Sequence, residues 1–202
     1  MRRPWHHPEF GGRAMVQVGR GDWLKAVVLA LGVTAVQLAC IRPPNLVDDW
    51  NGWRQADTQT IALNYAHDGI DLLWPRIAWG GDGSGAVEAE LQLYTAATGA
   101  ILALVGDDVE WPGRAVSAAC LLLTALLLFG LLAPRVGVLG ALSGEAALLT
   151  SVGATFLVSV QPDALGLCLA AASLVAFVAW TDTRHFYPGS SIFSFGTAGC
   201  NL

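Results

Sequence analysis

Residues 113–133 read GRAVSAACLLLTALLLFGLLA, and this stretch decides the fold class. It consists almost entirely of apolar residues, and as a helix it is long enough to cross the roughly 30 Å hydrocarbon core of a bilayer. The composition of the whole chain agrees, because 54% of the residues are hydrophobic and 13% are charged, whereas an average soluble domain has about 25% charged residues. We therefore expect an integral membrane protein.

Three further apolar stretches predict additional spans at about residues 23–41, 136–160 and 164–180. The expected fold class is all-α, a polytopic transmembrane helix bundle of about four spans. The third stretch contains one acid, Glu145. An acid inside a span is costly, so we expect Glu145 to form a hydrogen bond inside the bundle.

The distribution of charge predicts the orientation of these spans. Basic side chains outnumber acidic ones in residues 1–25, and Pro134-Arg135 is the only basic connector. Basic flanks stay in the cytoplasm. Residues 1–22 are therefore expected to be a cytoplasmic tail, residues 42–112 an outer loop, and residues 185–202 an irregular tail.

The outer loop is acidic and rich in Trp, a residue that favours the membrane surface. Helical spacing predicts a short helix over residues 56–68 that ends at Gly69. Residues 91–106 are apolar but short for a span, and acids flank both ends, so we expect an interfacial helix. If this helix does not cross the membrane, Asp57 and Asp163 lie on the same face.

Charge and cysteine usage exclude other classes. The net charge of −5 argues against a nucleic-acid-binding protein, which needs clustered Lys and Arg. The four cysteines form no CxxC pair, so neither a zinc site nor a disulfide framework is indicated.

Five short motifs carry a resemblance to a known family. They are WRQADT at 53–58, PRIAW at 75–79, VEAELQLY at 87–94, WPGR at 111–114 and QPDAL at 161–165. In this order they resemble the N-terminal part of bacterial membrane glycosyltransferases of superfamily C (GT-C), in particular proteins similar to dolichyl-phosphate-mannose protein mannosyltransferases. The resemblance covers about residues 20–184 and implies a GT-C-like membrane domain over residues 23–184. Because the family's members are longer, we expect a truncated form.

The resemblance implies a function and its partners. The family transfers a sugar, with inversion, from a polyprenyl-phosphate donor in the bilayer to a glycan, lipid or protein acceptor on the outer face. Asp57 matches the catalytic acid of the first outer loop, which takes the acceptor proton, and Asp163 matches a second acid. The expected location is the bacterial inner membrane, with the N-terminus in the cytoplasm.

Further candidates surround these two acids. Arg54 and Arg76 could stabilise a leaving phosphate. Glu88 and Glu90 could bind sugar hydroxyls, and Tyr94 could form a platform for the sugar or the prenyl chain. A divalent cation, Mg²⁺ or Mn²⁺, has its candidate ligands in Asp57, Asp163 and Glu90.

Ordinary structural roles are open for the same residues. Asp57 could cap the short helix, and Asp163 could stand at a helix N-terminus because the dipole favours an acid there. Arginines at an interface also meet lipid headgroups. The alternative function is therefore non-enzymatic, a polytopic membrane scaffold or transporter subunit whose acidic outer loop binds a cation or a partner.

Overall fold

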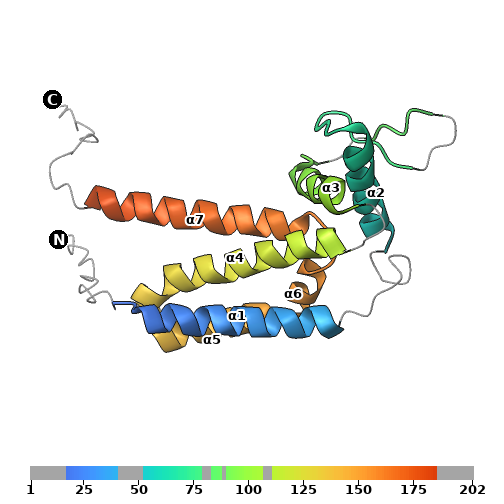
Figure 1. The fold of residues 1–202 in the computed structure, drawn as a ribbon. Coiled ribbons are helices and arrows are strands. Elements are labelled where there is room, and N and C mark those ends of the chain that lie inside the picture. Colours follow the sequence, from blue (N-terminus) through green and yellow to red (C-terminus); the bar gives the residue numbers. More distant parts are fainter. Residues whose placement is uncertain (1–16, 41–51, 79–82, 88–89, 107–110, 186–202) are drawn as a thin grey trace, which may run out of the picture.

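The computed structural model describes residues 17–40, 52–78, 83–87, 90–106 and 111–185. All regular secondary structure in these ranges is helical, apart from an isolated antiparallel bridge between Arg76 and Ala86. The all-α fold class is therefore confirmed. The helices are α1 (Arg20–Cys40), α2 (Gly52–Asp68), α3 (Leu93–Val105), α4 (Trp111–Val136), α5 (Val138–Leu149), α6 (Val152–Leu157) and α7 (Asp163–His185) (Figure 1).

Three helices are long and apolar enough to cross a membrane, namely α1, α4 and α7. The longest, α4, has 26 residues, and at 1.5 Å per residue it reaches about 39 Å. The chain thus has the helices of an integral membrane protein. The tails expected at 1–22 and 185–202 lie mostly outside the described residues, although α1 already begins at Arg20 and α7 runs to His185.

The prediction of one continuous helix over residues 136–160 is wrong. The chain turns at Gly137, whose φ is +84°, and α5 then ends after 12 residues. The hydroxyls of Thr150 and Ser151 donate to the carbonyls of Ala146 and Leu148, and such local bonds compete with the helical ladder. Ser151 Oγ then accepts from the N–H of Ala154 and caps the short α6.

The turn into α5 also corrects the expected connector. Pro134 and Arg135 belong to the last turn of α4 rather than to a loop. The Arg135 guanidinium donates to the Leu131 carbonyl at 2.7 Å and to Asp182 Oδ2 at 2.8 Å. It therefore joins the end of α4 to the end of α7.

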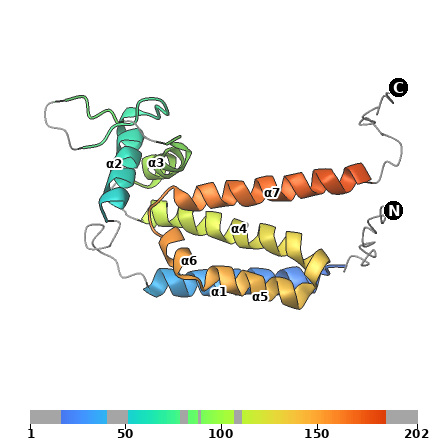
Figure 2. The same ribbon diagram turned by 180° about the vertical axis from the view of Figure 1, so that it is seen from behind.

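Helices α1, α4, α5 and α7 lie side by side and form the body of the molecule, which α6 completes (Figures 1 and 2). Helix α4 contacts each of the other three. Apolar packing holds α1, α4 and α5 together in two clusters: Ala30, Leu121, Ala125, Leu149, Ala154 and Val158 form one, and Ala26, Phe129, Ala133 and Ala141 form the other. The ring of Trp23 packs edge-on against Phe129, with 5.1 Å between centroids.

Helices α2 and α3, with the described residues between them, form what we call the polar end. It lies where α4 begins and α7 begins, away from the beginning of α1 and the end of α7 (Figures 1 and 2). The two helices approach closely at Gly99, where a Cβ atom would lie 2.8 Å from the Ala62 carbonyl oxygen and 2.8 Å from Tyr65 Cβ. Both predicted short helices are thus present, and Gly69 and Gly106 follow them with φ of +94° and +98°.

Candidate functional site

One face of α2 lines a pocket of about 300 Å³ at the polar end. Arg54, Asp57, Thr58 and Ile61 supply this wall, and their spacing places them on the same side of a helix. The volume is at the lower limit of pockets that bind small molecules. The sequence motif around Asp57 therefore forms one wall of a real cavity.

Other segments complete the pocket. Glu90 and Gln92 lie just before α3, Thr95 lies in its first turn, and Pro162 comes from the turn before α7. Ile77 and Val87 form an apolar side. The two segments that carry them are joined by bonds from the Ile77 N–H to the Gly85 carbonyl at 2.9 Å and from the Val87 N–H to the Pro75 carbonyl at 3.0 Å.

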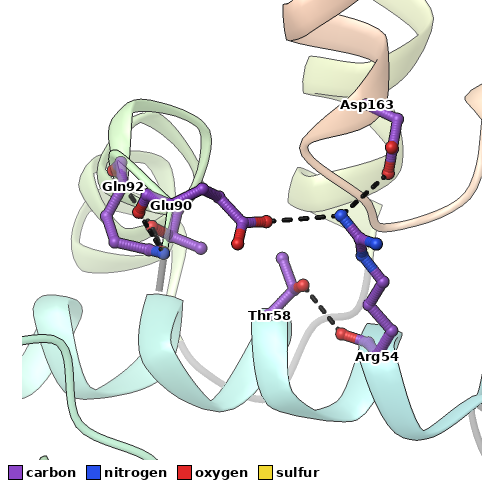
Figure 3. Close-up of polar contacts among 6 residues, drawn as sticks. Arg54, Thr58, Glu90, Gln92 and Asp163 are labelled. Carbon is purple, nitrogen blue, oxygen red and sulfur yellow. Dashed lines mark hydrogen bonds and ion pairs between the residues drawn. The ribbon is translucent and has the colours of Figure 1, made fainter. Parts of the chain in front are cut away.

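Arg54 lies between two carboxylates from distant parts of the chain (Figure 3). Its Nη2 atom is 3.3 Å from Glu90 Oε1 and 3.4 Å from Asp163 Oδ2. All three side chains are partly exposed, with 39%, 56% and 50% of their surface accessible. Solvent therefore screens these ion pairs, and another anion can compete for the guanidinium.

The Glu90 backbone is fixed by its neighbours. Gln92 Nε2 donates to the Glu90 carbonyl at 2.8 Å, and Thr95 Oγ1 donates to Gln92 Oε1 at 2.6 Å. On the opposite wall, Thr58 Oγ1 donates to the Arg54 carbonyl at 2.7 Å (Figure 3). Local hydrogen bonds therefore hold the backbone that carries the polar side chains of the pocket.

Tyr94 does not line the pocket. It is 1% exposed, its hydroxyl donates to the Gly113 carbonyl at 2.7 Å, and it lies 2.8 Å from Ser117 Oγ. Burial raises its pKa to about 12, so the phenol stays neutral. The interpretation of Tyr94 as a substrate platform is therefore corrected, since its ring and hydroxyl attach α3 to α4.

The sequence analysis missed two buried bonds, of which the first joins two segments of the body and the second joins the polar end to the body. Ser117 Oγ donates to the Ser159 carbonyl at 2.6 Å, and the Val160 N–H donates to Gln55 Oε1 at 3.3 Å. Gln55 lies inside the WRQADT motif. The periodicity of α2 could have placed Gln55 on a different face from Asp57. The sequence gives no sign of its partner, Val160, which is 105 residues away.

Arg76 also stands away from the pocket. Its Nη2 atom pairs with Asp68 Oδ2 at 2.7 Å, and its carbonyl accepts from Asn64 Nδ2 at 2.6 Å. The guanidinium pairs at the end of α2 and does not line the pocket, so its role at a leaving phosphate stays a prediction. The other proposed acid, Glu88, lies outside the described residues.

The two predicted catalytic acids lie at the same end of the bundle. Asp57 lines the pocket, and Asp163 is the exposed first residue of α7 and reaches the site through Arg54. The sequence analysis predicted that these two segments meet, because two spans separate them if residues 91–106 do not cross the membrane. The side of the membrane that they occupy stays a prediction.

The acids do not fit a divalent cation. Among the described residues, no group of three or more His, Cys, Asp or Glu side chains could hold a metal ion. Arg54 stands between Glu90 and Asp163, and its positive charge repels a cation there. We therefore derive no step through a metal.

Comparisons with protein families, with curated proteins and with solved structures found no match to this chain.

Proposed function

We propose that the chain is a membrane glycosyltransferase, which transfers a sugar from a polyprenyl-phosphate donor to an acceptor at the outer face of the membrane. The observation that carries the proposal is the pocket that holds Asp57 and Arg54 on one helical face, at the end of an apolar bundle. A polyprenyl chain is apolar, so it stays in the bilayer while its phosphate and sugar reach this end.

Asp57 is the general base of the proposed reaction. The acceptor hydroxyl gives its proton to the Asp57 carboxylate, and the acceptor oxygen forms a bond to the anomeric carbon. The bond between this carbon and the phosphate oxygen breaks, and its electron pair leaves with the polyprenyl phosphate. A single displacement of this kind inverts the anomeric configuration.

Arg54 receives the leaving phosphate. A guanidinium can form two parallel hydrogen bonds to phosphate oxygens, and it stabilises charge that grows in the transition state. Its two present partners, Glu90 and Asp163, are held at 3.3 and 3.4 Å. Once the phosphate displaces them, these carboxylates are available to accept hydrogen bonds from sugar or acceptor hydroxyls.

The resemblance of the five motifs to GT-C enzymes supports the same function and extends it. It favours a cytoplasmic N-terminus, the inner membrane of a bacterium, and a glycan, lipid or protein as acceptor. The pocket's mixture of one base, one guanidinium and two further acids is compatible with each of these acceptors.

Replacement of the base tests the function. In lipid vesicles that contain polyprenyl-phosphate sugars, we expect Asp57→Asn to lower sugar transfer by about 10²–10⁴-fold and to leave donor binding unchanged. The matched control is Asp68→Asn, because Asp68 pairs with Arg76 outside the pocket. Equal transfer by wild type and Asp57→Asn, or no transfer by wild type, contradicts the proposal and favours the scaffold or transporter subunit.

A further inference from the structure

Four oxygen atoms on α1 and α5 are buried without a hydrogen-bond partner in the described structure. They are Thr34 Oγ1, Gln37 Oε1 and both carboxylate oxygens of Glu145. Thr34 is 3% exposed and Glu145 is 1% exposed. The hydrogen bond expected for Glu145 is thus not formed, and that prediction is wrong. Buried polar atoms are satisfied in most proteins, so this group needs an explanation.

The register of the two helices brings these atoms to one interface. Helices α1 and α5 run in the same direction (Figures 1 and 2). Ala26 and Ala141 belong to one apolar cluster, and Gln37 Nε2 donates to the Leu149 carbonyl at 2.5 Å. Glu145 lies midway between Ala141 and Leu149, and therefore beside residues 30–34 of α1.

Gln37 lies on the face of α1 that turns toward α5, and Thr34 is buried one turn before it. They are three residues apart, which places their side chains next to each other on a helix. Gln37 is fixed on that face by its bond to Leu149. Because this bond uses the amide nitrogen, the amide oxygen is the atom that stays available.

The neighbouring helices bring no positive charge to this position. Residues 26–39 of α1 and 115–134 of α4 contain no charged side chain, and Glu145 is the only charged residue of α5. Lys25 pairs with Asp22 at the beginning of α1. An ionised carboxylate in such surroundings is costly unless a cation accompanies it.

The break after α5 adds a second feature of ion sites. Helix α5 ends at Leu149, one turn beyond Glu145. Its 12 residues reach about 18 Å, roughly half the length of α4, so the break lies inside the body. The C-terminal end of a helix carries partial negative charge, and broken helices form cation sites in membrane transporters.

We propose that Glu145, Thr34 and Gln37 bind a sodium ion between α1 and α5. The available atoms are all oxygens, which hard cations prefer. One carboxylate supplies one negative charge, so a monovalent ion leaves the site neutral, whereas a divalent ion leaves a positive charge in an apolar interior. The bound ion joins α1 to α5 at the level where α5 ends.

Thermal unfolding of the full chain in lipid nanodiscs tests the proposal, with tryptophan fluorescence as the readout. A ligand that binds only the folded state raises the unfolding temperature. We expect sodium chloride to raise Tm by about 4 °C or more over choline chloride at equal ionic strength. The same Tm in both salts overturns the proposal.

Two variants assign the site. Glu145→Gln keeps the size of the side chain and should abolish the difference between sodium and choline, whereas Asp68→Asn at the polar end should preserve it. Thr34→Val retains the charge and should raise the sodium concentration needed for half of the shift. A full sodium response in Glu145→Gln refutes the assignment.

Sodium-23 NMR on the wild-type chain tests sodium binding without any substitution. We expect the sodium line to broaden in the presence of the protein. A line width equal to that of protein-free nanodiscs, or a Tm that depends on pH but not on the identity of the cation, overturns the proposal. These readouts do not depend on sugar transfer, so they test the ion site separately from the proposed enzyme.

Discussion

The polar end and the body are stabilised in different ways. In the polar end, exposed ion pairs such as Arg54–Asp163 connect segments that are far apart in the chain, while a few buried bonds and one close glycine contact fix the helices. In the body, apolar side chains pack in two clusters, and Glu145 is buried between them. The comparison separates charge that is exposed and paired from charge that is buried without a hydrogen-bond partner in the described structure.

The energies of these contacts differ as well. An exposed ion pair contributes about 0–1 kcal/mol, so the pairs of Arg54 with Glu90 and Asp163 do not determine how the polar end sits on the body. Buried hydrogen bonds and close packing are worth more, because their loss leaves an unpaired group or an overlap. We therefore expect the polar end to detach when its buried contacts are changed, and to stay in place when its ion pairs are changed.

The largest effect is expected from Gly99→Leu. The new side chain would overlap the Ala62 carbonyl and Tyr65 Cβ, both 2.8 Å from the position of its Cβ atom. Overlap of this kind costs about 1–3 kcal/mol, so α2 and α3 should separate while the body stays folded. Limited proteolysis, with sites of cleavage identified by mass spectrometry, measures the separation.

Gly32→Leu is the matched control for this change. Gly32 is also in a helix, and nothing lies within 4 Å of the position of its Cβ atom. Equal protease resistance in Gly99→Leu and wild type would show that the polar end does not depend on the close approach of α2 and α3.

A smaller effect is expected from Tyr94→Phe, which removes the hydroxyl between α3 and α4. The Gly113 carbonyl and Ser117 Oγ each lose a partner, so the free energy of unfolding should fall by about 0.5–1.5 kcal/mol. Denaturant titration in micelles measures it. Tyr65→Phe is the comparison, because the Tyr65 hydroxyl has one partner in a partly buried position, the Asp71 carbonyl at 2.7 Å.

The titration of Tyr94 gives the same contact a pH dependence. Its pKa is raised from 10.0 to about 12 in the folded chain, chiefly by burial. The unfolded chain therefore loses this proton first, and the contribution of Tyr94 to stability should be complete below pH 10 and lost as the pH rises toward 12. If Tyr94→Phe shows the same alkaline loss as wild type, the hydroxyl is not the cause.

The smallest effect on stability is expected from Arg54→Gln. Both of its ion pairs are exposed, so the free energy of unfolding should change by no more than about 1 kcal/mol, although sugar transfer should fall because the phosphate loses its partner. A double-mutant cycle with Asp163→Asn measures the coupling. A coupling well above that value would mean that the ion pair holds the polar end to α7.

The helices could be predicted from the sequence more accurately than their breaks. The apolar stretch around residues 113–133 and the helical spacing around Asp57 predicted α4 and α2, because both signals are local. The end of α5 depends on hydroxyl groups of Thr150 and Ser151 that bond to their own turn. In a hydropathy pattern these residues are only slightly polar, so the stretch appeared continuous.

The candidate site was predicted in part. Arg54, Asp57 and Glu90 line one pocket, whereas Arg76 and Tyr94 have partners elsewhere, and the roles assigned to them stay predictions. All five residues are polar or amphipathic and lie in the same acidic segment. The sequence could not distinguish these five residues. They differ in the direction of their side chains, and that direction depends on contacts with helices that are distant in the sequence.

The amino-acid sequence by itself determined the helical class, three helices long and apolar enough to cross a membrane, and the presence of both acids at one end, because hydropathy and helical period are properties of neighbouring residues. Only the tertiary structure decided that Arg54 meets Glu90 and Asp163, that Tyr94 is buried, and that Glu145 lacks a hydrogen-bond partner. These facts depend on which helix faces which. That choice is made by packing between residues as far apart as Gln37 and Leu149.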